Sequence, residues 1–250
     1  MAELTYRQHR RRRDSEDGRT ILQLEDIHKT YTDGVEEEVL FGIDLELLAG
    51  DFAVLVGKSG SGKTTLLNIM GLLDTPTSGR LFLDDREASE LDEDERARLR
   101  REYLGFIFQF HHLLPDFDVL ENVLMPCRIR GRSYEEEARE RAVEMLEMVG
   151  LGDKIAAKVT ELSGGQQQRV ATVRAFANDP TVVLADEPTG SLDTKCSRSV
   201  MDLMGEINRE TGTAFLMVTH DEELTGYADR IVELEDGRVL SDRRSGESAP

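Results

Sequence analysis

The feature that most constrains this chain is a glycine-rich stretch at residues 57–65, with the sequence GKSGSGKTT. An apolar run, residues 52–56, precedes it and another, residues 66–70, follows it, so the local pattern predicts strand, turn and helix. The spacing G-x-x-x-x-G-K-T is that of the phosphate-cradling P-loop. Its glycines allow successive N–H groups to point into one nest for phosphate oxygens, and the helix adds its positive dipole end. The stretch therefore predicts a triphosphate site rather than an ordinary turn.

The polar side chains of this loop have distinct expected roles. Lys63 can bridge the terminal phosphates, and the Thr64 hydroxyl can ligate Mg²⁺. The residues expected to bind nucleotide are those of the whole loop, namely Gly57, Lys58, Ser59, Gly60, Ser61, Gly62, Lys63, Thr64 and Thr65. The cofactors implied are ATP and Mg²⁺.

Composition argues against several classes of protein. The formal charge of −19 argues against a nucleic-acid footprint, which would be basic, and against broad adhesion to anionic lipid. Any membrane contact should therefore run through a protein partner. No apolar run approaches the roughly 18 residues that cross a bilayer, and no apolar segment follows the N-terminal arginines, so we expect a cytosolic chain. Its two cysteines lack the spacing of a metal cluster.

The first part of the chain predicts an appendage to the nucleotide core. The length of 250 residues fits one large α/β domain or one domain with a smaller addition. Residues 1–19 are polar, and we interpret them as a solvated flexible arm rather than a lipid-touching basic tail. Strands expected at residues 21–27 and 39–48 precede the first long helix, which predicts an antiparallel β layer.

The last part of the chain predicts a closing hairpin over residues 231–240. The polar residues from Asp242 onward are expected to fray. The nucleotide-binding domain is therefore expected at residues 20–242, with a flexible tail at 243–250.

The middle of the chain carries a helical pattern. Ser133 and Glu136 have the spacing of a capping box, and Gly150 is a helix stop. Between them an apolar stripe at helical spacing predicts a face turned to the core, formed by Tyr134, Ala138, Ala142, Met145, Leu146 and Val149.

Two adjacent acids follow a short apolar strand expected at residues 182–185. An acid at the tip of a core strand is where a P-loop protein places its Mg²⁺ partner, and Asp186 fits that role. Glu187 can face a water in line with the γ-phosphate and act as the general base.

Two further polar residues end expected strands. His220 follows residues 213–218, where it could donate a hydrogen bond to the γ-phosphate and sense its presence. Gln109 follows residues 104–108, where its amide can bind Mg²⁺ or the attacking water. Both are therefore catalytic candidates, and Gln109 is a metal-ligand candidate together with Thr64 and Asp186.

A second glycine motif, LSGGQ at residues 162–166, precedes a helix expected at residues 167–178. Like the P-loop it presents backbone N–H groups and a helix N-terminus. One triphosphate does not need two cradles, so we expect this motif to contact the nucleotide of a second copy, with ATP between two chains packed head to tail. A flexible serine-glycine hinge is the alternative.

Taken together, these motifs resemble the full ordered set of an ABC-transporter ATPase over about residues 21–240. They comprise residues 57–64, Gln109, residues 162–169, residues 182–187, residues 191–193 and His220. The resemblance implies an α/β fold: a P-loop, RecA-like core with an antiparallel β subdomain and an inserted helical subdomain at roughly residues 111–177.

The resemblance also implies specific contacts. Tyr31 should stack on adenine, and the 191–193 turn should cross the interface of a homodimer. Ser163 and Gly165 should close on the γ-phosphate bound by the other protomer. The expected nucleotide-binding residues of this motif are Ser163, Gly164, Gly165 and Gln166.

The segment at residues 104–117, with residues 120–123, closely resembles the ATP-binding subunit of the bacterial lipoprotein-releasing (Lol) transporter. That family implies ATP hydrolysis that drives lipoproteins out of the inner membrane. It implies two integral membrane subunits docking near residues 110–117, and a peripheral place on the cytoplasmic face of the inner membrane. An exposed apolar and aromatic patch on an acidic chain likewise predicts a partner.

Two features differ from the usual pattern of the Lol family: Gln167 and Gln168 follow the second glycine motif, and the N-terminal arm is longer. Other ATPases related to this family are therefore alternatives. The alternatives are a macrolide-type exporter ATPase and the ATPase of a non-transporting cell-division complex. A DNA-repair ATPase would carry a long coiled coil between the two glycine motifs, and a translation factor would carry two cassettes, so both are disfavoured.

Overall fold

The computed structural model describes residues 18–244 apart from 33, 191, 193 and 221. The expected arm up to residue 17, the expected interface residues Ser191 and Asp193, and the tail from residue 245 lie outside the described residues.

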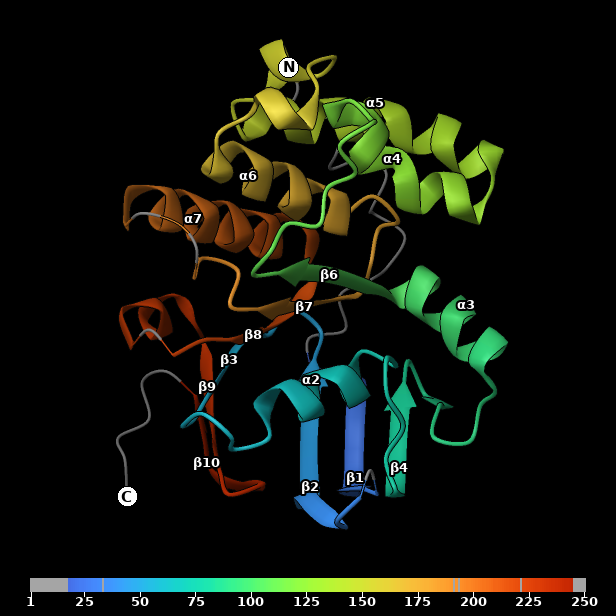
Figure 1. Cartoon of the computed structure of the whole chain (residues 1–250), viewed down its shortest axis with the longest axis vertical. Coiled ribbons are helices and arrows are strands. Elements are labelled where there is room, and N and C mark those ends of the chain that lie inside the picture. The colour runs from blue at the N-terminus through green and yellow to red at the C-terminus, as the bar shows by residue number, and fades with distance from the viewer. Residues whose placement is uncertain (1–17, 33, 191, 193, 221, 245–250) are drawn as a thin grey trace.

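Within this part of the chain the strands form two sheets (Figure 1). The larger sheet has the order β10-β9-β3-β8-β7-β6, parallel throughout except for the β9–β10 hairpin. Its strands are β3 (Phe52–Val56), β6 (Leu104–Phe108), β7 (Val182–Asp186), β8 (Ala214–Val218), β9 (Arg230–Glu235) and β10 (Arg238–Arg244). The expected core strands and the closing hairpin are therefore confirmed.

The smaller sheet is the antiparallel layer that the sequence predicts. Its order is β2-β1-β4-β5. The strands are β1 (Thr20–Tyr31), β2 (Glu37–Leu48), β4 (Ser78–Leu83) and β5 (Arg86–Glu87). The first two are longer than expected because they pair with each other along most of their length.

Helices cover both faces of the larger sheet. They are α2 (Lys63–Met70), α3 (Glu93–Tyr103), α4 (Val119–Arg130), α5 (Arg132–Met148), α6 (Gly164–Ala175) and α7 (Thr194–Thr211), with 3₁₀ turns η1 (Gly152–Lys154), η2 (Val159–Glu161) and η3 (Glu222–Tyr227). Among the described helices, none combines the length and the apolar character needed to span a bilayer.

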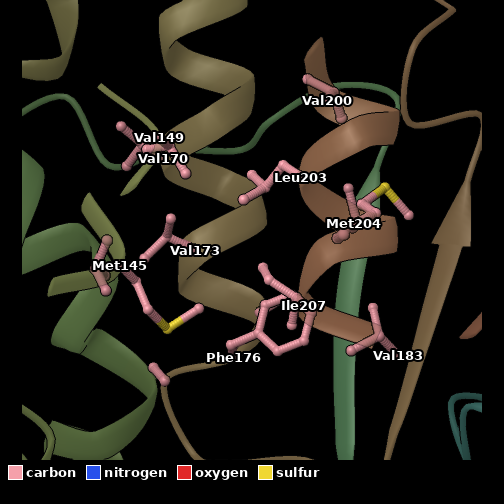
Figure 2. Packing of buried hydrophobic residues seen from close by; sticks show 14 of the residues in the cluster. Met145, Val149, Val170, Val173, Phe176, Val183, Val200, Leu203, Met204 and Ile207 are labelled. Carbon is pink, nitrogen blue, oxygen red and sulfur yellow. The ribbon is translucent and has the colours of Figure 1, made fainter. Parts of the chain in front are cut away.

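Alternation along the strands separates two apolar cores. In β3, Phe52 and Val54 belong to the core shared with α4 to α7, whereas Ala53 and Leu55 belong to the core shared with α2 and the antiparallel sheet. Figure 2 shows the first core, where α6 and α7 pack on each other and on β7. Its labelled residues include Val170, Val173, Phe176, Val183, Val200, Leu203, Met204 and Ile207. The parallel strands are thus packed on one face by α4 to α7 and on the other by α2 and the antiparallel sheet.

The expected capping box at Ser133 is wrong. Helix α5 begins at Arg132, its cap is Gly131, and no side chain caps it. Gly131 alone turns the chain from α4 into α5, which places Ser133 inside the first turn. Tyr134 is 42% exposed, with the Arg130 guanidinium 4.1 Å from its ring centre, so it does not join the core. The rest of the apolar stripe is buried as expected.

The C-terminal residues do not fray from Asp242, because β10 continues to Arg244. The buried carboxylate of Asp51 explains this: Arg230 Nη1 and Arg244 Nη2 each lie 3.1 Å from its oxygens. Arg230 also pairs with Asp242 at 2.5 Å. These ion pairs tie the end of the chain to the turn before β3.

Candidate nucleotide site

The P-loop joins β3 to α2 and is shaped by its glycines. A Cβ at position 57 would lie 2.2 Å from the Leu234 carbonyl oxygen and 2.8 Å from Ser61 Oγ, so β9 leaves no room for a side chain. Gly62 caps α2 with φ 98°, in the left-handed region. The Lys63 ammonium donates to the carbonyls of Gly57 at 2.8 Å and Lys58 at 2.7 Å, which holds the loop closed on itself.

A cavity of about 510 Å³ opens over this loop. Its lining brings together most of the expected site, namely Gly57, Ser59, Gly60, Gly62, Lys63, Thr64, Thr65, Asp186, Glu187 and His220. Val39 and Val218 complete the lining, and no sequence motif marks Val39, which is placed there by β2.

Lys58 and Ser61 do not line the cavity. The Lys58 ammonium pairs with Glu235 at 2.8 Å. Ser61 is buried beneath the loop, and among the described atoms its Oγ has no hydrogen-bond partner. The backbone of Ser61 instead contacts the β9–β10 turn, because its carbonyl oxygen accepts from the Gly237 N–H at 3.1 Å.

The acids at the end of β7 lie against the loop. Burial raises the pKa of Asp186, and the neighbouring Glu187 carboxylate raises it further, whereas Lys63 opposes both effects. Glu187 has φ 44°, an uncommon conformation for a non-glycine residue, and its N–H donates to the Val218 carbonyl at 2.9 Å. Its Oε1 lies 2.9 Å from His220 Nδ1, so the structure brings the expected base and the expected sensor into contact.

The Gln109 side chain lies next to Gly190, as does that of Glu187. A Cβ at Gly190 would lie 3.1 Å from Gln109 Nε2 and 3.3 Å from Glu187 Oε2, so both side chains converge on that glycine. Gln109 itself does not line the cavity.

The residues present fit Mg²⁺. Thr64 and Asp186 supply a hydroxyl and a carboxylate to one cavity, the oxygen donors that Mg²⁺ prefers. The adjacent Glu187 makes this corner electronegative, with Lys63 as the opposing cation.

The second glycine motif starts a helix, as expected, but earlier. Ser163 and Gln166 form a capping box, with Ser163 N–H donating to Gln166 Oε1 at 2.9 Å, so α6 begins at Gly164 rather than at Gln167. Gly165 is buried; a Cβ there would lie 2.8 Å from Cys196 Sγ on α7. The motif does not line the P-loop cavity of its own chain.

Tyr31 ends β1 and likewise lies outside the lining of the cavity. Its hydroxyl donates to Asp74 Oδ2 at 3.0 Å, and the Lys29 ammonium lies 4.8 Å from its ring centre. Burial raises the pKa of Asp74, but hydrogen bonds from Lys29, the Thr75 N–H and Tyr31 outweigh it and leave the pKa below its usual range. The ring, 38% exposed, is therefore held in one orientation.

The segment at residues 110–117 is irregular, as expected. Phe110 is 67% and Leu114 40% exposed, whereas Leu113 packs against the core. The exposed large apolar side chains of this segment are therefore Phe110 and Leu114, and the apolar patch is smaller than the sequence predicts.

Comparison with known proteins agrees with this geometry. The ABC transporter family matches residues 40–190. A lipoprotein-releasing system ATP-binding protein LolD of Anaeromyxobacter dehalogenans is 51% identical over 230 residues, 90% of this chain and 96% of the relative. LolD 1 of Rhodopseudomonas palustris is 50% identical over 222 residues, 88% of this chain and 98% of the relative.

Among solved structures, the dimeric post-hydrolysis state of the ATP-binding cassette MJ0796, bound to ADP and Pi, superposes with a TM-score of 0.81 at 41% identity. The match covers 90% of this chain and 98% of that one. With its P-loop, its paired acids at the end of β7 and its antiparallel β layer, the chain belongs to the ABC transporter family as an ATP-binding, ATP-hydrolysing cassette.

Proposed function

We propose that this chain is the ATPase subunit of a transporter that releases lipoproteins from the bacterial inner membrane towards the outer membrane. The observation that carries the proposal is the identity of about half of the aligned residues, over about nine-tenths of the chain, with LolD proteins of several bacteria. The chain would work as a homodimer, on the cytoplasmic face of the membrane, with two integral membrane subunits docked on the exposed part of residues 110–117.

Within the cavity, the residues divide by chemistry. The loop amides and Lys63 bind the phosphates. Mg²⁺ would be held by Thr64 and Asp186 and would neutralise charge on the phosphates, with Gln109, which lies beside Gly190 and outside the cavity lining, as a further candidate ligand. Glu187 accepts a proton from the attacking water, and His220, in contact with Glu187 Oε1, keeps that carboxylate oriented and reaches the γ-phosphate.

The homodimer completes the site in this proposal. The motif at the start of α6 is absent from the lining of its own chain's cavity, and the first turn of a helix has N–H groups without partners inside the helix. A second copy packed head to tail would bring them to the γ-phosphate, while Tyr31 stacks on adenine. The domain would comprise residues 20–242 with a helical part at about 111–177; β10 extends it to Arg244.

The catalytic assignment is tested with Glu187→Gln. Loss of a general base should lower ATP turnover by about 10²- to 10⁴-fold and leave ATP binding intact, so that an ATP-bound dimer accumulates on size exclusion. Glu140→Gln, an exposed acid on α5, is the control and should change neither. Normal hydrolysis by the Glu187 variant would remove this residue as the base.

The membrane assignment is tested by purifying the tagged chain from detergent-solubilised membranes and identifying the proteins that accompany it. Changing Phe110 and Leu114 to Ser should remove them without altering basal ATPase activity. Ile129→Ser is the control, because Ile129 is 66% exposed on the end of α4. Co-purification of division-site proteins would reject the role in lipoprotein release. Membrane partners that stay bound to the double variant would reject the docking surface.

A further inference from the structure

Arg174, on α6, makes an unusual set of contacts for an arginine. It donates from Nη1 to the His112 carbonyl at 2.8 Å and from Nη2 to the His111 carbonyl at 2.7 Å. Burial lowers its pKa, and no described carboxylate offsets that effect. Arg174 is partly buried, and both of these hydrogen bonds go to backbone carbonyls of one irregular segment rather than to a carboxylate.

The segment that Arg174 holds, residues 110–117, forms neither a helix nor a strand. His112 has φ 45°, in the left-handed region. At the far end of the segment the fully buried Asn122 of α4 accepts from the Leu114 N–H at 2.7 Å and donates to the Leu114 carbonyl at 3.1 Å and the Phe117 carbonyl at 3.3 Å. Side chains from α4 and α6 therefore fix the backbone shape of residues 110–117.

Helix α6 connects this segment to the second glycine motif. It runs without interruption from Gly164 to Ala175, so Arg174 stands about 15 Å along the helix from the turn that begins at Ser163. The helix has no break, and it packs on α7 and β7 (Figure 2). A displacement of the whole helix would therefore also displace the carbonyls that Arg174 holds.

We infer that Arg174 is a positioning residue that couples the N-terminus of α6 to the docking segment at residues 110–117. Closure of two chains around ATP would move α6, and the forked guanidinium would move Phe110 and Leu114 with it. The inference rests on the proposed function for the homodimer that closes on ATP and for the identity of the docked partner, but not for the contacts of Arg174.

The coupling is measured in the isolated chain by amide hydrogen exchange, with and without ATP, in the Glu187→Gln background. We expect ATP to change exchange over residues 110–117, including the Leu114 amide. In Arg174→Met that change should fall by more than half while the change over the first turn of α6 persists. Arg141→Met is the matched control, because Arg141 also donates to a backbone carbonyl, that of Ala177, at 2.6 Å.

If Arg174→Met does not fold, Arg174→Lys replaces it, since a lysine keeps the charge and loses the planar fork. The second arm uses the purified membrane complex. The fold-stimulation of ATPase activity by the membrane subunits should drop towards one in the Arg174 variant, with the same amount of membrane subunit bound.

An unchanged ATP response over residues 110–117, or full stimulation of the complex, overturns the coupling. Stimulation lost only because the subunits no longer bind also overturns it, since Arg174 would then merely support docking. If the wild-type chain recruits no membrane subunits, the proposed function fails while the exchange result still decides the coupling.

Discussion

Replacing Gly57 by alanine, compared with the same change at Gly60, tests the geometry of the P-loop most directly. Both glycines have positive φ, 155° and 81°. A Cβ at position 60 meets nothing within 4 Å, whereas at position 57 it would lie 2.2 Å from the Leu234 carbonyl oxygen. Ordinary contacts of a carbon are about 3.5 Å, so the overlap exceeds 1 Å against a backbone atom of β9.

The two substitutions should differ in magnitude for that reason. Each loses about 1–2 kcal/mol because alanine disfavours positive φ. Gly57→Ala should lose about 1–3 kcal/mol more, the typical cost of overpacking, which corresponds to roughly 5- to 150-fold in an equilibrium constant.

Urea unfolding of the nucleotide-free protein gives the loss in unfolding free energy. Because the loop can relieve the overlap by moving away from β9, affinity for a fluorescent ATP analogue is measured on the same samples. If Gly57→Ala loses no more than Gly60→Ala in either measurement, the contact between the loop and Leu234 does not constrain the site.

Two further outcomes follow from charges in the structure. Because burial and Glu187 raise the pKa of Asp186, its carboxylate protonates at a higher pH than an ordinary aspartate. The apparent Kd for Mg²⁺, measured in a nucleotide-binding titration, should therefore rise as pH falls. In Glu187→Gln the pH midpoint of that rise should move to a lower value. Asp51→Ala should lower the unfolding free energy by about 2–4 kcal/mol, because the buried Arg230 loses one of its two carboxylate partners and keeps Asp242 and the Glu46 carbonyl. The exposed Asp153→Ala should lower it by less than about 0.5 kcal/mol, and equal losses would show that the buried network is not stabilising.

The parts of the fold that the sequence predicts are those with local causes. A few adjacent residues are enough to predict the P-loop, the acids at the end of β7 and the β9–β10 hairpin. The same holds for α6, except that the capping box formed by Ser163 and Gln166 starts the helix at Gly164, before the predicted start at Gln167.

What the sequence does not reveal depends on residues far apart in the chain. Arg174 meets its carbonyl partners across 62 and 63 residues, and no local pattern announces that contact. The pairing of Arg244 with Asp51 is equally distant and keeps β10 ordered where the polar composition predicts fraying. Gly131 overrides the capping-box spacing at Ser133, because a glycine can turn the chain without any side chain.

The two carbonyl contacts of Lys63 bear on how a nucleotide-null protein should be made. Substituting the P-loop lysine would remove the proposed phosphate ligand, and it also removes the hydrogen bonds of Lys63 to the Gly57 and Lys58 carbonyls. A defect in such a variant would then combine weaker nucleotide binding with a less constrained loop backbone, and adding more ATP would not separate the two effects. For this chain, the clean reference state is the unaltered protein kept free of nucleotide.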